Sequence, residues 1–446
     1  MSKSEIYDVI LKNADVYLPG GLAQVDIGVR NGQIVALEKL NAAKAGTVRD
    51  LSGLTVLPGF IDSQVHFREP GLEHKENLAT GAAAAVCGGI TSVFEMPNTN
   101  PTTTTEAALK DKLDRAAGRM ACDHAFFVGA SPDNIDQIAD LEDLPGSAGI
   151  KVFMGSSTGT LLVEREELLE EVLRRGHRRA SFHSEDEDML RAQYAGVQDG
   201  THVREHPHIR SVEAAVTSTT RLLRLAEKTK RLIHVLHIST AQELPLLAAN
   251  RSWATCEVTP NHLFLAGPEA YDRLGSKAQM NPPVRDQSHQ DALWKAIASG
   301  LIDVMGSDHA PHTLEEKAKP FPASPSGMPG VQTTVALMLN AVHQGRLSLT
   351  RLVDLLASGP QRIFGIQNKG RIAPGYDADF TIVDLQRTET IAAAWLKSKA
   401  GWSPYEGETI TGWPVMTYVR GTLAAEEGEL ASPAQGRPVK FLAART

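Results

Sequence analysis

The 446-residue sequence has few of the features that mark secreted, membrane-bound or nucleic-acid-binding proteins. Its three cysteines, Cys87, Cys122 and Cys256, lie far apart in apolar surroundings and do not suggest a disulfide framework. The first residues lack the basic and apolar pattern of a signal peptide, and no apolar run approaches the length of a membrane span. A formal charge of −8 disfavours nucleic acids and membrane surfaces as partners. We therefore expect a cytoplasmic protein.

The sequence also lacks a glycine-rich phosphate loop, because no GxGxxG or Walker pattern follows any strand-like run. Instead, apolar strand-like runs alternate with helix-like stretches. The predicted strands are 55–66, 91–97, 123–130, 149–154, 180–184, 232–239, 254–260 and 303–307. The predicted helices are 78–87, 105–117, 134–142, 164–176, 211–230, 241–249 and 288–299. This alternation favours a closed (β/α)8 barrel over a doubly wound sheet.

Both ends of the chain have a different pattern, that of short strands and hairpin turns. Residues 5–57 contain turn pairs such as Asn31-Gly32 between alternating segments, and residues 370–385 and 413–430 resemble them. We predict an α/β fold: a (β/α)8 TIM-type barrel with a small β-sandwich domain formed from both termini. The predicted division is 1–57 and 366–446 for the β-domain and 58–365 for the barrel.

Polar residues gather at the carboxyl ends of the predicted barrel strands. Asp62, Gln64 and His66 follow one another at every second position, so they share one face of an extended strand. Later strand ends add Lys151, His183, His237, and Asp308 followed by His309 and His312. In a barrel, such residues converge on one point, where three imidazoles, a carboxylate and a lysine would form a metal site. The alternative is that each is a separately satisfied core residue.

Lys151 requires an argument of its own. Its neighbours Ile150, Val152 and Phe153 are apolar, and desolvation of the ammonium lowers the pKa of a lysine. A neutral amine can take up carbon dioxide to give a carbamate, whose oxygens can bridge two cations. The alternative is a lysine that extends from the strand end toward a carboxylate.

Eight strings in order along the chain then resemble the amidohydrolase superfamily and, within it, the dihydroorotases. They are VHFREPG (65–71), EMPNTNPTT (95–103), IKVFMGSSTG (150–159), FHSEDE (182–187), HIST (237–240), MNPPVR (280–285), SDHAPHTLEEK (307–317) and GRIAPGYDADFTIVD (370–384). The strings MPNTNP and DHAPHTLEEK in particular resemble dihydroorotases rather than hydantoinases or allantoinases. The similarity covers essentially the whole chain.

The resemblance implies a binuclear zinc centre. By the family pattern, His66 and Asp308 would hold the more buried zinc ion, His183 and His237 the other, and carboxylated Lys151 would bridge the two. Arg68, Asn98 and His312 match positions that bind the substrate's carboxylate, and Asn281 matches one that contacts the pyrimidine ring. Considered alone, Asn98 and Asn281 are equally compatible with turn-forming asparagines.

One position departs from the family pattern. The family's first barrel strand carries HxH, whereas this chain has Gln64-Val65-His66. An amide oxygen is a poorer zinc ligand than an imidazole. Two consequences are open: the buried metal binds through Gln64 or water with reduced affinity, leaving one zinc ion instead of two, or the chain is a silent paralogue.

The resemblance implies a dihydroorotase of pyrimidine biosynthesis, which reversibly hydrolyses the cyclic amide of (S)-dihydroorotate to N-carbamoyl-L-aspartate. Asp308 would act as general base and then as general acid. The alternatives are another cyclic amidohydrolase, of hydantoinase or allantoinase type, and a catalytically weak or silent scaffold. A small-molecule substrate, a homodimer and association with aspartate transcarbamoylase are further expectations from the resemblance.

Overall fold

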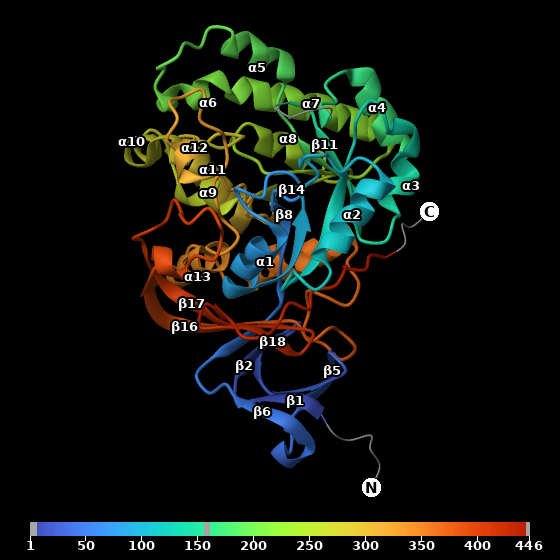
Figure 1. The fold of residues 1–446 in the computed structure, drawn as a ribbon, viewed down its shortest axis with the longest axis vertical. Coiled ribbons are helices and arrows are strands. Elements are labelled where there is room, and N and C mark those ends of the chain that lie inside the picture. Colours follow the sequence, from blue (N-terminus) through green and yellow to red (C-terminus); the bar gives the residue numbers. More distant parts are fainter. Residues whose placement is uncertain (1–6, 156–160, 443–446) are drawn as a thin grey trace.

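The structure, a computed structural model, describes residues 7–155 and 161–442. Residues 156–159, the end of the IKVFMGSSTG string, therefore lie outside the described residues. The described chain has two parts, a barrel surrounded by helices and a smaller β-domain beneath it (Figure 1). Among the helices of the described residues, none is long and apolar enough to cross a lipid bilayer.

The barrel is an eight-stranded sheet in which neighbouring strands follow the chain order. Its strands are β8 (Phe60–Val65), β9 (Ile90–Glu95), β10 (Asp123–Gly129), β11 (Ser147–Phe153), β12 (Ala180–His183), β13 (Ile233–Val235), β14 (Ala254–Val258) and β15 (Val304–Met305). Every pair in this order is parallel. The first and last strands meet where the His66 amide donates to the His309 carbonyl at 2.7 Å. The predicted TIM-type barrel is therefore confirmed.

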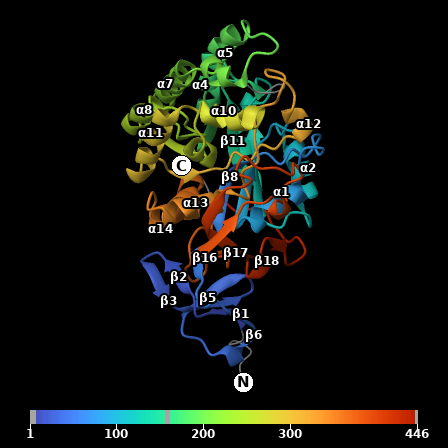
Figure 2. The same cartoon turned by 90° about the vertical axis from the view of Figure 1, so that its left-hand side faces the viewer.

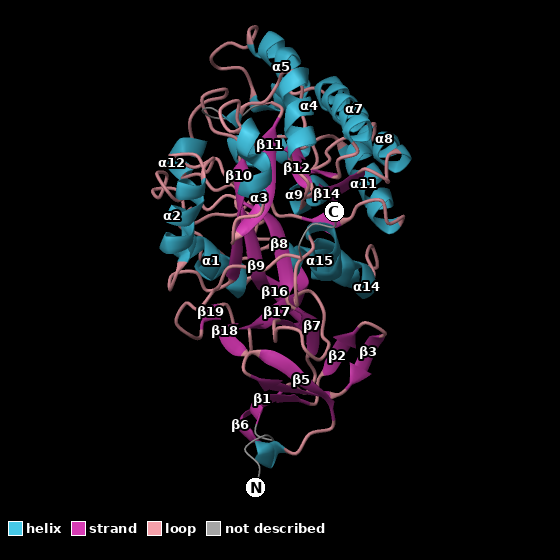
Figure 3. Ribbon diagram, turned by 90° about the vertical axis from the view of Figure 1, so that its right-hand side faces the viewer, coloured by secondary structure: helices cyan, strands magenta, loops and turns pink. Residues whose placement is uncertain are grey.

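Helices cover the outside of the barrel and connect its strands (Figure 3). Those between strands include α1 (Leu78–Cys87), α2 (Glu106–Ala116), α3 (Ile138–Glu142), α4 (Glu166–Arg175), α7 (Val212–Thr229), α8 (Glu243–Ala249) and α11 (Gln287–Ala298). Polar caps define several starts: the Asn77 side chain accepts from the Ala79 and Thr80 amides and begins α1. Helix α4 is amphipathic and buries Leu169, Val172 and Leu173.

Further helices lie in the loops or follow the last strand. The loops at the strand ends carry α5 (Glu187–Tyr194), α6 (His206–Ile209), α9 (Pro260–Phe264), α10 (Glu269–Leu274) and α12 (Leu314–Lys317). After β15 the chain forms α13 (Thr334–His343), α14 (Leu349–Val353), a π-helical turn (Asp354–Ser358) and α15 (Gly359–Phe364). In Figure 1, α5, α6 and α7 lie at the end of the barrel farthest from the small domain.

The small domain contains two sheets, and one of them combines both ends of the chain, as predicted. The four-stranded sheet has the order β5 (Gln33–Glu38), β4 (Asp26–Arg30), β1 (Tyr7–Lys12) and β6 (Ala45–Asp50). The seven-stranded sheet has the order β19 (Glu429–Leu430), β18 (Thr422–Glu426), β17 (Thr409–Val419), β16 (Phe380–Thr390), β7 (Thr55–Pro58), β2 (Asp15–Leu18) and β3 (Gly21–Gln24). Figure 2 shows β16–β18 between the barrel and the N-terminal strands.

The predicted strand 55–66 is wrong in one respect, because it is two strands in two different sheets. Strand β7 pairs with β16 in the small domain, and β8 begins the barrel. Gly59 separates them where two segments approach closely: a Cβ there would lie 2.5 Å from Thr91 Oγ1 and 2.6 Å from Asp379 Cβ. Only glycine fits this junction without displacing its neighbours.

Aromatic side chains fill the barrel interior. Phe94 of β9 contacts the ring of Phe364, and also that of Phe441, at centroid distances of 5.5 Å. Phe441 belongs to the C-terminal segment, which returns to the barrel because the Val439 amide donates to the His124 carbonyl at 2.8 Å. Because this apolar cluster contains no group that could react, a catalytic site in the barrel is expected at the polar carboxyl ends of the strands.

Candidate metal centre and anion-binding pair

The polar residues predicted from the strand ends are all buried, and they lie near the carboxyl ends of their strands. Three of them have an unusual backbone: φ is +67° at Arg68, +59° at His237 and +49° at Asp308. Side chains other than glycine rarely adopt these values, and such strain is typical of functional sites.

His66 presents an unprotonated nitrogen to Asp308. Its Nδ1 lies 2.7 Å from Asn98 Oδ1, which can only accept, so Nδ1 carries the proton. Its Nε2 then faces Asp308 Oδ1 at 3.1 Å as one acceptor opposite another. Burial lowers the pKa of His66, which keeps the ring neutral. A cation between these two acceptors would satisfy both.

His183 likewise presents an unprotonated nitrogen, here to His237. Its Nε2 donates to Glu185 Oε2 at 2.8 Å, so Nδ1 is unprotonated and faces His237 Nε2 at 2.9 Å. Arg210 forms an ion pair with Glu185, and together with His183 it holds the pKa of this carboxyl well below its usual range despite burial. An imidazole that donates one N–H to a carboxylate and offers its other nitrogen is the common arrangement of metal-binding histidines.

Lys151 lies on β11 in the same electrostatic environment. Burial lowers the pKa of its amine to about 7, although the charges of Asp308 and Glu257 act in the opposite direction. Burial lowers the pKa values of His66, His183 and His237, and the positive charge of Lys151 adds a smaller effect in the same direction. Its Nζ lies 4.6 Å from the centre of the Phe153 ring. At neutral pH, this lowered pKa leaves part of the amine neutral, and carboxylation requires the neutral amine.

Gln64 stands where the resemblance leads us to expect the first of two histidines. Its Nε2 donates to Asp308 Oδ1 at 3.0 Å. Its Oε1 is buried without a hydrogen-bond partner among the described residues. A buried acceptor without a partner is costly, so this oxygen is available to a cation or a water molecule.

These residues fit a divalent cation in their chemistry, but they form two contacting pairs rather than one cluster. Within 7–155 and 161–442, three ligand atoms of histidine, cysteine or carboxylate type lie within 4.8 Å of one another only at Asp123, Asp377 and Asp379. That acidic cluster already holds cations of the chain itself, because Lys369 Nζ lies 2.6, 3.0 and 2.6 Å from the three carboxylates in that order and Arg420 forms an ion pair with Asp123. It joins the barrel to the small domain and is not a metal site.

A second polar group lies beside the candidate metal centre. Arg68 Nε donates to the Pro311 carbonyl at 3.1 Å, and its Nη2 lies 3.2 Å from His312 Nε2. Lys75 Nζ, which can only donate, contacts His312 Nδ1 at 3.1 Å, so the proton of the neutral imidazole is on Nε2. This Nε2–H donates to the Ser326 carbonyl at 3.0 Å. Arg68 Nη2 and His312 Nε2 are therefore two donors that face each other, an arrangement that an anion would satisfy.

Asn281 lies apart from these contacts. Its Oδ1 is 3.1 Å from His206 Nε2, which also lies 2.9 Å from the Met280 carbonyl. His309 likewise faces away, since its Nδ1 accepts from the Gly330 amide at 3.1 Å. The structure thus brings His66, Asn98, Gln64 and Asp308 into contact, and separately pairs His183 with His237 and Arg68 with His312.

Several contributors to the site were not predicted from the sequence. The loop 319–330 is held by the buried Lys317, whose Nζ donates to the Pro325 and Gly327 carbonyls at 2.8 and 3.0 Å. Trp402 Nε1 donates to the His312 carbonyl at 2.8 Å, so the C-terminal segment also supports the site. Glu185 had a sequence signal, since it lies within the FHSEDE string, but Trp402 had none.

Comparisons with known proteins identify the family of the chain and agree with its barrel fold. The amidohydrolase family matches residues 55–424. The dihydroorotase of Methanothermobacter thermautotrophicus is 36% identical over 411 residues, covering 91% of this chain and 92% of that protein. The dihydroorotase of Methanosarcina mazei is 35% identical, with 96% and 97% coverage. The solved L-hydantoinase (dihydropyrimidinase) of Arthrobacter aurescens has a TM-score of 0.90 at 30% identity, covering 96% of this chain and 98% of that one.

Proposed function

This chain belongs to the amidohydrolase family, and we propose that it is the hydrolase that opens the cyclic amide of (S)-dihydroorotate to N-carbamoyl-L-aspartate, reversibly. The relatives named dihydroorotase match over nearly the whole chain, which supports this substrate. The reaction requires a site for the ring amide and a separate site for the substrate's carboxylate.

The facing donors of Arg68 and His312 are the observation that carries the proposal. A carboxylate oxygen that binds beside this pair accepts a charge-assisted hydrogen bond from Arg68 Nη2, and the Nε2–H of His312 exchanges the Ser326 carbonyl for the same oxygen. Burial lowers the pKa of Arg68 only to about 10, so the guanidinium stays charged at neutral pH. Lys75 and Lys317 add positive charge around His312. A ring that carries a carboxylate is thus preferred over one that does not.

We assign the metal centre to His66 and Asp308 on one side and to His183 and His237 on the other, with Lys151 between them in carboxylated form. Zinc is the cation that this set of nitrogen and oxygen donors favours. When bound, a zinc ion supplies the Lewis acidity that polarises a carbonyl and acidifies water. Because Gln64 offers only an amide oxygen, we propose that the side of His66 and Asp308 binds its cation more weakly.

Asp308 is the proposed proton carrier. Gln64 Nε2 donates to its Oδ1, which orients the carboxylate and leaves Oδ2 outside this contact. Asp308 accepts a proton from the attacking water and returns it to the ring nitrogen as the amide bond breaks. Arg68 and His312 hold the substrate during this exchange, so that attack occurs on an already oriented ring. Asn98 keeps His66 in the required tautomer through the contact with Nδ1.

A second candidate is the opening of hydantoin-type rings, because solved hydantoinase structures superpose on this chain over nearly its whole length. The two proposals differ in the carboxylate, which dihydroorotate carries and hydantoin lacks. The Arg68–His312 pair therefore favours dihydroorotate.

The test compares turnover of dihydroorotate, hydantoin and allantoin by the full-length protein, together with its zinc content. Dihydroorotate should give the highest kcat/KM, and Arg68→Met should reduce that preference. Faster opening of hydantoin or allantoin would favour the second candidate. Absence of both zinc and turnover would support the silent scaffold and refute catalysis.

The domain division, the location and the partners predicted from the sequence are also part of this proposal. We propose that residues 58–365 form the catalytic barrel domain and that 1–57 with 366–446 form the β-domain. The cytoplasmic location remains the prediction from the sequence composition, and a homodimer and association with aspartate transcarbamoylase follow from the resemblance. Size measurement of the purified chain, alone and mixed with aspartate transcarbamoylase, tests the last two.

A further inference from the structure

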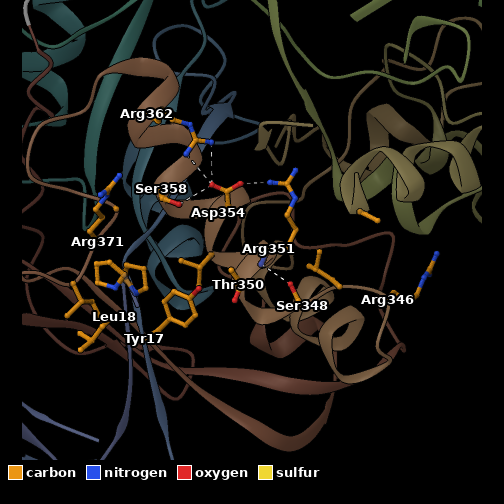
Figure 4. Close-up of a pocket in the computed structure, with 17 residues that line it drawn as sticks. Tyr17, Leu18, Arg346, Ser348, Thr350, Arg351, Asp354, Ser358, Arg362 and Arg371 are labelled. Atoms are coloured by element: carbon orange, nitrogen blue, oxygen red, sulfur yellow. Dashed lines mark hydrogen bonds and ion pairs between the residues drawn. The ribbon is translucent and has the colours of Figure 1, made fainter. Parts of the chain in front are cut away.

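A pocket of about 680 Å³ lies far from the candidate metal centre, at the junction of the barrel with the small domain. One wall is formed by Tyr17 and Leu18 of β2, and the other by α14, the π-helical turn and α15 (Figure 4). Its volume falls in the range of small-molecule sites. Nothing in the proposed reaction uses this pocket.

The charge of the pocket is opposite to that of the whole chain. Four arginines line it, Arg346, Arg351, Arg362 and Arg371, against the single carboxylate of Asp354. The chain as a whole has a formal charge of −8. A concentration of guanidinium groups around a cavity in an acidic protein indicates an anionic ligand.

Asp354 does not neutralise all of these groups. Arg351 is fully engaged, because it forms an ion pair with Asp354 and donates to the carbonyls of Ile297 and Ile302. Arg362 contacts the same carboxylate more loosely, with both Nη atoms 3.3 Å from Asp354 Oδ1. Ser358 Oγ also donates to this oxygen, at 3.1 Å. Arg351 and Ser358 therefore anchor Asp354, and Arg362 is the more readily redirected partner.

Arg371 lies on the same side of the pocket as Arg362 (Figure 4). It donates through Nε to Gln361 Oε1 at 2.9 Å, a contact that leaves its two Nη atoms for another acceptor. The preceding Gly370 has φ +79°, and a Cβ there would lie 2.6 Å from the Ala357 carbonyl. This tight junction holds the start of the 370–372 segment against the π-helical turn and fixes the place of Arg371.

The rest of the wall is suited to an apolar or aromatic body. Tyr17 and Leu18 lie below Arg371 and Asp354 in Figure 4, and Ile372, Leu347 and Val353 also line the pocket. Arg346 lies at the opposite end from Arg371, and its guanidinium stacks on the Trp294 ring at 4.1 Å. A ligand with a planar body beside Tyr17 and a phosphate near Arg362 and Arg371 would match both the apolar and the basic part of the pocket.

We propose that this pocket is a binding site for a phosphomonoester with a planar body, of the class of nucleoside 5′-monophosphates. Arg362 and Arg371 bind the phosphate, and Tyr17 stacks against the base. This site is separate from the candidate metal centre and does not depend on the proposed function.

The test is titration calorimetry of the full-length protein with uridine 5′-monophosphate, ribose 5-phosphate and inorganic phosphate. We expect saturable binding of the nucleotide and weaker binding of the two smaller anions. Arg362→Gln with Arg371→Gln should weaken nucleotide binding at least tenfold. Arg174→Gln is the matched control. The Arg174 side chain is 53% exposed and paired with Glu170, and the Arg362 side chain is similarly 52% exposed and paired with Asp354. The control should leave binding unchanged.

Tyr17→Leu separates the two halves of the proposal. It should reduce the preference for the nucleotide over ribose 5-phosphate at least fivefold and leave phosphate binding unchanged. No saturable binding at millimolar nucleotide, or equal binding by the double variant, would overturn the assignment. A third outcome is that the unchanged protein binds no nucleotide and the double variant has a different oligomeric state in sedimentation. That result would assign the arginines to a subunit contact instead.

Discussion

Replacing Gln64 by histidine is the most informative change to the candidate metal centre. In the present chain, Gln64 Nε2 donates to Asp308 Oδ1 at 3.0 Å, while Oε1 is buried without a partner among the described residues. The substitution removes a hydrogen bond to a carboxylate, worth about 1.5–3 kcal/mol, and supplies an imidazole nitrogen. The two side chains have similar volumes, so the change does not require a new cavity.

The expected result is tighter zinc binding. Changes to a single supporting group of a metal site alter affinity by roughly 10–100-fold, and a direct imidazole ligand should contribute at least the lower value. A tenfold change corresponds to about 1.4 kcal/mol. We expect Gln64→His to bind zinc at least tenfold more tightly in competition with a chromophoric chelator, and to turn over dihydroorotate faster.

Gln64→Met is the matched control, since it keeps the side-chain length but has neither the oxygen nor the N–H donor. It should bind zinc more weakly than the unchanged protein. If the histidine and methionine variants both bind zinc like the unchanged protein, position 64 does not face the cation, and the reasoning about this side of the centre is refuted.

Three further predictions concern the Arg68–His312 pair, the acidic cluster and the buried histidines. Arg68→Met should raise the KM for dihydroorotate about 100-fold without changing zinc per chain, because the lost bonds are charge-assisted; a change in kcat alone would contradict this. Lys369→Met leaves three clustered carboxylates without the cation that they share. It should lower the free energy of unfolding, measured by urea titration, by about 3–5 kcal/mol. The control Lys110→Met removes an exposed ion pair and should change this free energy by less than about 0.5 kcal/mol. Burial lowers the pKa values of His206 and His234 to about 3, so unfolding takes up protons. The contribution of these two histidines to stability should therefore fall as the pH decreases from about 6.5 toward 4, by up to ~1.4 kcal/mol per pH unit for each histidine. A variant with both histidines replaced by glutamine should lose less stability between pH 7 and pH 5 than the unchanged protein, and an equal loss of melting temperature in both would contradict this.

Most of the barrel could be predicted because strand and helix periodicities differ and alternate regularly along the chain. The exception at 55–66 has a physical cause: β7 and β8 are both buried and apolar, so hydrophobicity does not mark the boundary between them. The boundary is set by the close approach of Thr91 and Asp379 to Gly59, which is a tertiary contact. Helix α5 was not predicted, since it is short and buries only Leu190.

The sequence predicted those residues of the candidate site whose place is set by the end of a barrel strand. His66, Lys151, His183, His237 and Asp308 all follow apolar strand runs, and a barrel brings such positions to one end.

The partners that set the protonation of the site residues were less accessible from the sequence. Arg210 lies 25 residues after the Glu185 that it pairs with, and Lys75 lies far along the chain from His312. Such contacts depend on loop conformation, for which the local pattern carries no signal.

Anomalous diffraction at the zinc edge, measured on crystals of the full-length protein, tests the central claim most directly. The prediction is a strong peak between His183 and His237, and a weaker or absent second peak beside His66 and Asp308, with Lys151 carrying extra density at Nζ. Zinc bound elsewhere, or no peak within ligand distance of His183 and His237 in crystals grown with zinc, would contradict the account.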